Sequence, residues 1–207
     1  NTYDGGTTIS SGTLYVNNTT GSGTGTNTVT LDAPNGSGTT PVLGGTGTIA
    51  GSVDVNGSMT NGPSIIAPGD GGTPTATLST GSVSFGAYSE IDAEIGGNTT
   101  GNYDQLNVTG SVTIGANVGL LFFAANSYVP VLGDTYVIIN NDSTDAVSGT
   151  FDGLPEGATI STDFLSSGYA ATITYAGGDG NDVVITVGVA TITVATTGSV
   201  VTFTGTT

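Results

Sequence analysis

Residues 82–114, SVSFGAYSEIDAEIGGNTTGNYDQLNVTGSVTI, decide the fold class of this chain. The stretch contains four short runs in which apolar and polar residues alternate, at residues 83–85, 91–95, 106–108 and 112–114. Alternation with a period of two places the apolar side chains on one face of an extended strand and the polar side chains on the other. Glycine, asparagine and threonine separate the runs, so the sequence predicts short strands joined by turns.

The charge balance of the chain excludes several classes of function. The 207 residues include no Lys, Arg or His and 16 Asp plus Glu, which gives a formal net charge of −16. Nucleic acids and anionic lipids are bound through Lys and Arg, so neither is an expected partner. Catalytic triads and phosphate-binding loops also need His or Lys. No apolar run is long enough for a transmembrane helix, so membrane insertion is not expected.

The rest of the composition indicates an ordered all-β protein. The hydrophobic fraction is 36%, and the 36 glycines together with abundant threonine suit turns and strands. No segment has the apolar periodicity of a long helix. The chain contains no cysteine, which excludes disulfides and cysteine zinc sites.

Several phrases resemble one family of surface proteins. NTYDGGTTISSGTLYV at residues 1–16 resembles the passenger-associated repeat of bacterial autotransporters and related surface proteins. PVLGGTGTIAG at residues 41–51, the Ala-Pro-Gly turn at residues 67–69 and DQLNVTG at residues 104–110 resemble later phrases of that family, in the same order. The matches together cover most of residues 1–186. The resemblance implies a right-handed parallel β-helix.

Internal near-repeats also favour a solenoid over a sandwich or barrel. Gly-Gly-Thr-Gly-Thr-Ile and Asn-Gly-Ser-Met recur as near-copies of one unit, which is typical of stacked turns. We expect a β-helix domain over residues 1–187 and extra C-terminal strands over residues 188–207, which act as a cap or as a strand donated to another subunit. Seven apolar residues in the second quarter of the chain are expected to face inward: Leu43, Ile49, Val53, Val55, Met59, Ile65 and Ile66.

The most apolar segment is residues 118–140, within which Leu121, Phe122 and Phe123 follow one another. Three consecutive large apolar residues predict a strand that is buried on both faces. The alternative is an exposed apolar patch that serves association.

Two acidic patterns could carry chemistry. GGDGNDVVI at residues 177–185 fits the nonapeptide of calcium-binding β-rolls, so Asp179 and Asp182 are candidate calcium ligands. The pattern occurs once, and a purely structural turn is the alternative. No cofactor is required, and calcium is the one ion that the sequence suggests.

Glu90, Asp92 and Glu94 alternate along one strand, which places three carboxylates on one face about 7 Å apart. The preferred interpretation is a solvated face, with a weak cation site or a pair of glycosidase carboxylates as the alternatives. We expect no enzymatic activity. The tyrosines could form a stacking platform for sugars, although core positions are commoner for aromatic residues; they are Tyr15, Tyr88, Tyr103, Tyr128, Tyr136, Tyr169 and Tyr175.

These observations predict a bacterial extracellular structural protein at the cell surface. It would be a self-assembling subunit of a fibre, filament or sheath, formed by intersubunit β-strand addition, with copies of itself as the main partner. The alternative is the passenger segment of an autotransporter-type adhesin that binds host or biofilm glycans. The residues expected to carry self-association are those of the two alternating runs at the C-terminus: Val189, Ala190, Ile192, Val194, Val200, Val201 and Phe203.

Overall fold

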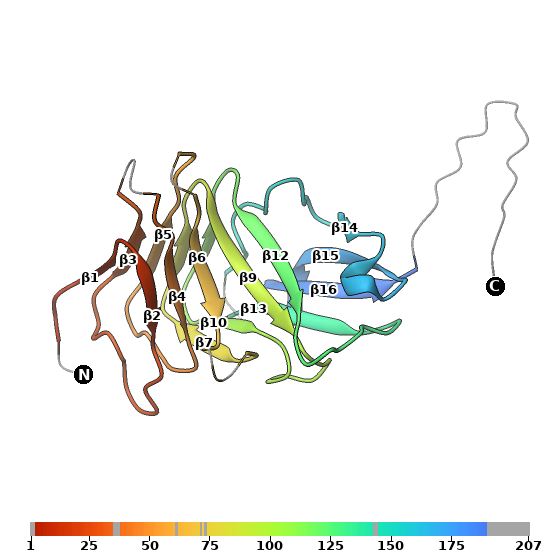
Figure 1. Cartoon of the computed structure of the whole chain (residues 1–207), viewed down its shortest axis with the longest axis horizontal. Helices are drawn as coiled ribbons and strands as arrows, with labels where there is room; N and C mark the ends of the chain where they lie inside the picture. The colour runs from red at the N-terminus through yellow and green to blue at the C-terminus, as the bar shows by residue number, and fades with distance from the viewer. Residues whose placement is uncertain are drawn as a thin grey trace, which may run out of the picture.

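The computed structural model is a parallel β-solenoid of about four turns followed by a mixed sheet (Figure 1). It describes residues 3–34, 38–60, 62–70, 72, 74–142 and 145–189. The predicted all-β class and the stacked solenoid are confirmed. The right-handed winding implied by the family resemblance stays a prediction.

Two of the three sheets are entirely parallel. The first contains, in spatial order, β1 (Thr7–Ile9), β3 (Val29–Asp32), β5 (Val53–Asn56), β8 (Val83–Phe85) and β11 (Val112–Ile114). The second contains β2 (Gly12–Tyr15), β4 (Pro41–Gly45), β6 (Ser64–Pro68), β9 (Ser89–Ile95) and β12 (Gly119–Ala124). Each turn of the solenoid, here called a rung, therefore contributes one strand to each of these sheets.

The third sheet changes from parallel to antiparallel pairing. Its parallel part consists of β7 (Thr77–Thr80), β10 (Gln105–Val108) and β13 (Thr135–Asn141). Its antiparallel part adds β16 (Asp182–Gly188), β15 (Ala170–Gly177) and β14 (Thr159–Ser161). A short 3-10 helix, η1 (Phe164–Ser166), precedes β15, and its Phe164 packs edge-on against Phe122 of β12.

The core forms because the alternating runs stack in register. In the first sheet, Val29, Val53, Val83 and Val112 occupy equivalent positions on successive rungs, and all four are buried. Two residues further along lies a second buried column, made of Leu31, Val55, Phe85 and Ile114. β-Branched and aromatic side chains suit this pleated, buried surface. The central core therefore runs along the solenoid axis.

Close contact between successive rungs requires glycine at some corners. A Cβ atom on Gly51 would lie only 2.0 Å from the carbonyl oxygen of Asn27 on the preceding rung. No side chain fits at that distance, so glycine sets how closely the two rungs approach.

Most of the residues expected to face inward do so, and two do not. Leu43, Ile49, Val53, Val55 and Ile66 are fully buried. The prediction for Met59 is wrong, because this residue lies in a turn after β5 and its side chain is 75% exposed. Ile65 is half-buried, because it alternates with Ile66 and therefore faces outward from β6.

The prediction that Leu121–Phe123 is buried on both faces is also wrong. Leu121 and Phe123 are 40% and 45% exposed, whereas Leu120 and Phe122 pack against the core. Along the neighbouring strand β9 only the inward-facing side chains are fully buried, and β12 follows the same alternation, so its outward-facing side chains stay exposed.

The chain beyond β16 bears on the predicted self-association. Val189 is described and is 72% exposed. Ala190, Ile192, Val194, Val200, Val201 and Phe203 lie outside the described residues. In the described part of the chain, no helix is both long and apolar enough to cross a membrane.

Candidate functional site

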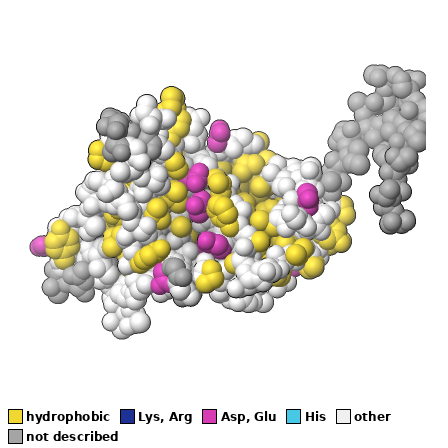
Figure 2. Space-filling view, in the orientation of Figure 1, with side chains coloured by type: hydrophobic (Ala, Val, Ile, Leu, Met, Phe, Trp, Pro, Cys, Tyr) yellow, Lys and Arg dark blue, Asp and Glu magenta, His cyan; other side chains and the backbone are white. Residues whose placement is uncertain are grey.

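The most distinctive chemical feature is a row of carboxylates on the outer face of β9. Glu90, Asp92 and Glu94 alternate with the buried residues of that strand. They lie beside Gly119, Leu121 and Phe123, respectively, of β12. Figure 2 shows a row of acidic side chains across the middle of this face, with hydrophobic side chains on either side. We call these three residues together with Asp104 the acidic ladder.

The ladder is less solvated than its sequence pattern indicates. Glu90, Asp92 and Glu94 are all half-buried. The pKa of Asp92 is raised to about 7, first by burial and then by a hydrogen bond with Glu90 and by repulsion from Glu90 and Glu94. In the described structure its Oδ1 atom is buried without a hydrogen-bond partner. Because the chain contains no Lys, Arg or His, no cationic side chain can offset the charge of this row.

Asp104, which lies just before β10 and contacts Glu94, is the fourth member of the ladder. Sequence reasoning missed it as a site residue. Its side chain is buried, its Oδ1 accepts the backbone N–H of Ala76 at 2.8 Å, and its Oδ2 accepts that of Glu94 at 2.9 Å. Burial and a side-chain hydrogen bond with Glu94 raise the pKa of Asp104 to about 9, although the two backbone hydrogen bonds oppose this rise. Burial therefore favours the protonated form of Asp104.

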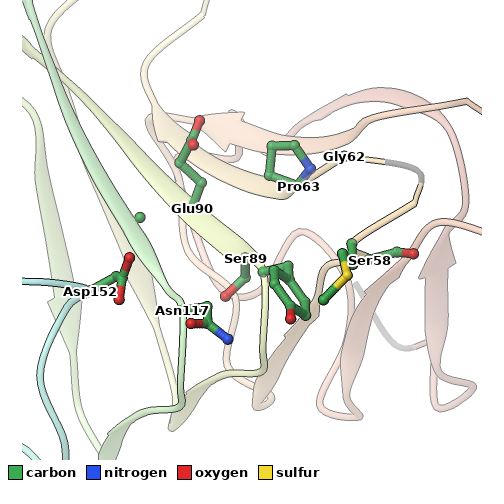
Figure 3. A pocket seen from close by; sticks show the side chains of 10 residues that line it. Ser58, Gly62, Pro63, Ser89, Glu90, Asn117 and Asp152 are labelled. Carbon is green, nitrogen blue, oxygen red and sulfur yellow. The ribbon is translucent and has the colours of Figure 1, made fainter.

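Two clefts lie at the two ends of the ladder. A cleft of about 330 Å³ contains Glu90 and is lined by ten residues from well-separated stretches of the sequence: Ser58, Met59, Gly62, Pro63, Tyr88, Ser89, Glu90, Asn117, Gly119 and Asp152. In Figure 3, Asn117 and Asp152 lie toward one end of it, Ser58 and Pro63 toward the other, and Glu90 between them. A smaller cleft of about 170 Å³ contains Glu94, Tyr15 and Asp70.

The carboxyl groups of the acidic ladder can accept hydrogen bonds and exchange protons. Two carboxyl groups of different pKa could in principle act as general acid and base. However, Asp92 and Asp104, whose pKa values are raised, line neither of the two clefts. The absence of enzymatic activity stays a prediction.

The candidate calcium ligands lie at the hairpin between β15 and β16. Asp179 is exposed at the turn, whereas Asp182 is buried, pairs with Gly177 and accepts the backbone N–H of Asn141 at 2.9 Å. Burial raises the pKa of Asp182, the hydrogen bond from Asn141 opposes that rise, and the charge of Asp179 adds to it.

Sequence reasoning missed two oxygens beside this hairpin. Asn141 and Asn181 are buried, and the Oδ1 atom of each has no hydrogen-bond partner in the described structure. Both side-chain amides donate to the carbonyl oxygen of Asp145. Within the described ranges, no three or more His, Cys, Asp or Glu side chains are grouped to hold a metal ion. Calcium at this hairpin therefore stays a prediction, and it would need amide oxygens as ligands.

The tyrosines divide between the core and the two clefts. Tyr103, Tyr136 and Tyr175 are buried, and the first two pack edge-on. Tyr128 and Tyr169 are partly buried against the core. Tyr15 and Tyr88 line the two clefts. The core positions that the sequence favoured are therefore found for Tyr103, Tyr136 and Tyr175, and the seven tyrosines do not form one continuous platform.

The chain and its fold were compared with what is known of other proteins. A comparison with protein-family models, with curated proteins and with solved structures finds no match to it. What stands is a β-solenoid of about four turns.

Proposed function

We propose that this chain is a bacterial extracellular structural protein, a self-assembling subunit of a fibre, filament or sheath at the cell surface. The observation that carries the proposal is that the second sheet has a strand edge at each end. Among the described strands, β2 pairs only with β4, and β12 pairs only with β9. A strand edge presents backbone N–H and C=O groups to any strand that can pair with it. Such edges suit intersubunit strand addition.

The composition of β12 adds a driving force for assembly. Leu121 and Phe123 are exposed on this strand, and Val129, Val131 and Leu132 are more than half exposed in the segment that follows. Burial of apolar surface between copies would favour association. The net charge of −16 opposes it, so salt should promote assembly by screening the repulsion.

The C-terminal residues supply the strand in this proposal. The sequence of residues 190–203 contains two alternating apolar runs without a charged residue, which suits pairing with an edge strand of a second copy. The chain also has no Lys or Arg, the residues at which trypsin-type proteases cut. This composition favours an extracellular location.

Deletion of residues 189–207 tests the assembly proposal. The full chain should form fibres visible by negative-stain microscopy, more readily at higher salt, while the truncated protein should stay monomeric in sedimentation. The double variant Leu121→Thr/Phe123→Thr should assemble more weakly, whereas Val42→Thr, a matched change on an inner strand of the same sheet, should not. Normal fibres from the truncated protein would contradict strand donation, and a full chain that stays monomeric at every salt concentration would contradict assembly.

A second candidate is the passenger segment of an adhesin that binds host or biofilm glycans. It is favoured by the two clefts at the ends of the acidic ladder, each of which pairs a tyrosine with carboxylates. Binding of immobilised glycans by the monomeric truncated protein would support this candidate, and its failure to bind a broad glycan panel would count against it.

A further inference from the structure

The cleft beside Glu90 contains two residues in an unusual backbone conformation. Tyr88 and Asn117 have φ angles of 60° and 58°, and both line this cleft. They occupy corresponding corners of successive rungs, just before β9 and β12, and the backbone N–H of Tyr88 donates to the carbonyl oxygen of Asn117 at 3.2 Å. Asparagine tolerates the left-handed region, but a bulky aromatic residue rarely adopts it. Strain of this kind clusters at functional sites.

The space around Glu90 depends on a missing side chain on the neighbouring strand. A Cβ atom on Gly119 would lie 3.1 Å from Oε2 of Glu90 and 3.3 Å from its Cγ. Asp152 is exposed at the same end of the cleft as Asn117, where its backbone N–H donates to Val118 at 2.8 Å (Figure 3). Two carboxylates and one amide thus line this cleft together with the apolar side chains of Met59 and Pro63.

The side chains of this cleft match one class of ligand. Carboxylates accept hydrogen bonds from hydroxyl groups, an asparagine amide both donates and accepts, and an aromatic ring packs against the C–H face of a sugar. An acidic sugar would bring negative charge beside Glu90 and Asp152 with no Lys, Arg or His anywhere in the chain to pair with it. The cleft therefore disfavours uronic acids and sulfated sugars.

We propose that this cleft is a binding site for an uncharged, hydroxyl-rich saccharide, with Tyr88 as the stacking surface and Glu90, Asn117 and Asp152 as its polar contacts. The site does not depend on the self-assembly proposal. It rests on the glycan-binding candidate and gives it a definite location and ligand class.

Titration calorimetry with matched oligosaccharides tests the site. Unsubstituted glucan, mannan and galactan oligomers are compared with sulfated and uronic oligomers of the same length, using the truncated protein and the full chain. We expect at least one neutral oligomer to bind and its acidic counterpart to bind at least tenfold more weakly. Binding of none of the neutral oligomers at millimolar concentration, or equal binding of the charged ones, would overturn the proposal.

Variants separate binding from folding. Tyr88→Asn removes the ring but suits the left-handed conformation, so it should weaken binding at least tenfold without lowering the melting temperature. Glu90→Gln should weaken binding through the loss of a charged acceptor, and Gly119→Ala should do so by crowding Glu90. Tyr15→Ala, in the other cleft, is the control and should leave affinity unchanged.

The opposite pattern, with loss of binding in Tyr15→Ala and none in Tyr88→Asn, would move the site to the other cleft and reject this inference. Fibre formation by the full-chain variants, measured alongside, reports on the assembly proposal separately.

Discussion

The backbone N–H of Glu94 donates a hydrogen bond of 2.9 Å to Oδ2 of Asp104, and the two side chains also share a hydrogen bond. This contact joins the end of β9 to the corner before β10. The other carboxylate oxygen of Asp104 accepts a hydrogen bond from the backbone N–H of Ala76, just before β7. A buried carboxyl group therefore organises one corner of the solenoid. Because the carboxyl group of Asp104 is buried, its ionisation is unfavourable and the stability of the fold should depend on pH.

The first prediction is that the protein loses stability as the pH rises. The pKa values of Asp92 and Asp104 are about 7 and about 9 in the folded chain, above their ordinary value of 3.8. A group with a raised pKa in the folded state contributes stability that is fully present below the unfolded pKa and is lost as the pH rises through the folded pKa. The melting temperature should therefore fall between about pH 4 and about pH 9.

The variant Asp104→Asn checks the cause of this pH dependence. It removes the titrating group at the cost of one of the two backbone hydrogen bonds, so it should be less stable than the native chain at pH 5 and show a shallower decline toward pH 9. Melting curves followed by circular dichroism measure both effects. A melting temperature that is constant or rises over this range in the native protein would contradict the raised pKa values.

The second prediction concerns the contact between rungs at Gly51. A methyl group there would lie 2.0 Å from the backbone oxygen of Asn27, so Gly51→Ala must displace backbone and should destabilise the fold by about 1–3 kcal/mol. Gly188→Ala is a matched control, because nothing lies within 4 Å of the added methyl group. Urea titrations should show a lower midpoint for the first variant only. Equal midpoints would mean that the rungs can separate at this corner at little cost.

The third prediction concerns Asp134, which holds four donors. Its Oδ2 accepts hydrogen bonds from the hydroxyl groups of Tyr128 (2.6 Å) and Tyr136 (3.2 Å) and from the backbone N–H of Val131 (2.8 Å). Its Oδ1 accepts one from Asn98 at 2.8 Å. Burial would raise the pKa of Asp134, but these hydrogen bonds outweigh it and lower the pKa.

Asp134→Ala leaves those donors without their acceptor and should destabilise the protein by about 2 kcal/mol or more. Asp32→Ala, an exposed aspartate at the end of β3, should change stability by less than about 0.5 kcal/mol. Thermal denaturation of both variants at pH 7 provides the measurement. A loss at Asp134 no greater than that at Asp32 would show that solvent replaces the network at little cost.

The fourth prediction is that calcium stabilises the hairpin between β15 and β16. A cation that binds only the folded chain raises the melting temperature. The effect would depend on Asp182, whose pKa the charge of Asp179 helps to raise. It would also depend on the amide oxygens of Asn141 and Asn181, which have no hydrogen-bond partner among the described residues. Millimolar calcium should raise the melting temperature of the native chain, and Asp182→Asn should abolish the rise while Asp163→Asn should preserve it. No rise in the native chain would leave the motif as a structural turn.

Sequence reasoning located most strands because the alternation is strong. The expected runs at residues 83–85, 91–95, 106–108 and 112–114 correspond to β8, β9, β10 and β11. It failed at Met59 and at Leu121, where hydrophobicity alone indicated burial. Burial there depends on whether a layer exists for the side chain to pack against, and no local pattern contains that information.

The candidate site was predicted only in part for a similar reason. Glu90, Asp92 and Glu94 could be placed on one face from their spacing, but their partial burial depends on the neighbouring strand β12. Asp104 could not be joined to Glu94, because the contact closes across a corner between two sheets.

The sequence by itself determined the all-β class, the stacked solenoid and the absence of Lys, Arg and His side chains, because alternation, glycine-rich corners and composition are properties of the chain that need no tertiary contact. Only the tertiary structure decided that burial raises the pKa of Asp92, which asparagine oxygens lack a hydrogen-bond partner among the described residues, and that Ser58, Tyr88, Asn117 and Asp152 line one cleft. The physical reason is the stacking itself. A solenoid brings together residues about one rung apart, and both burial and pKa depend on those neighbours rather than on the sequence around each residue.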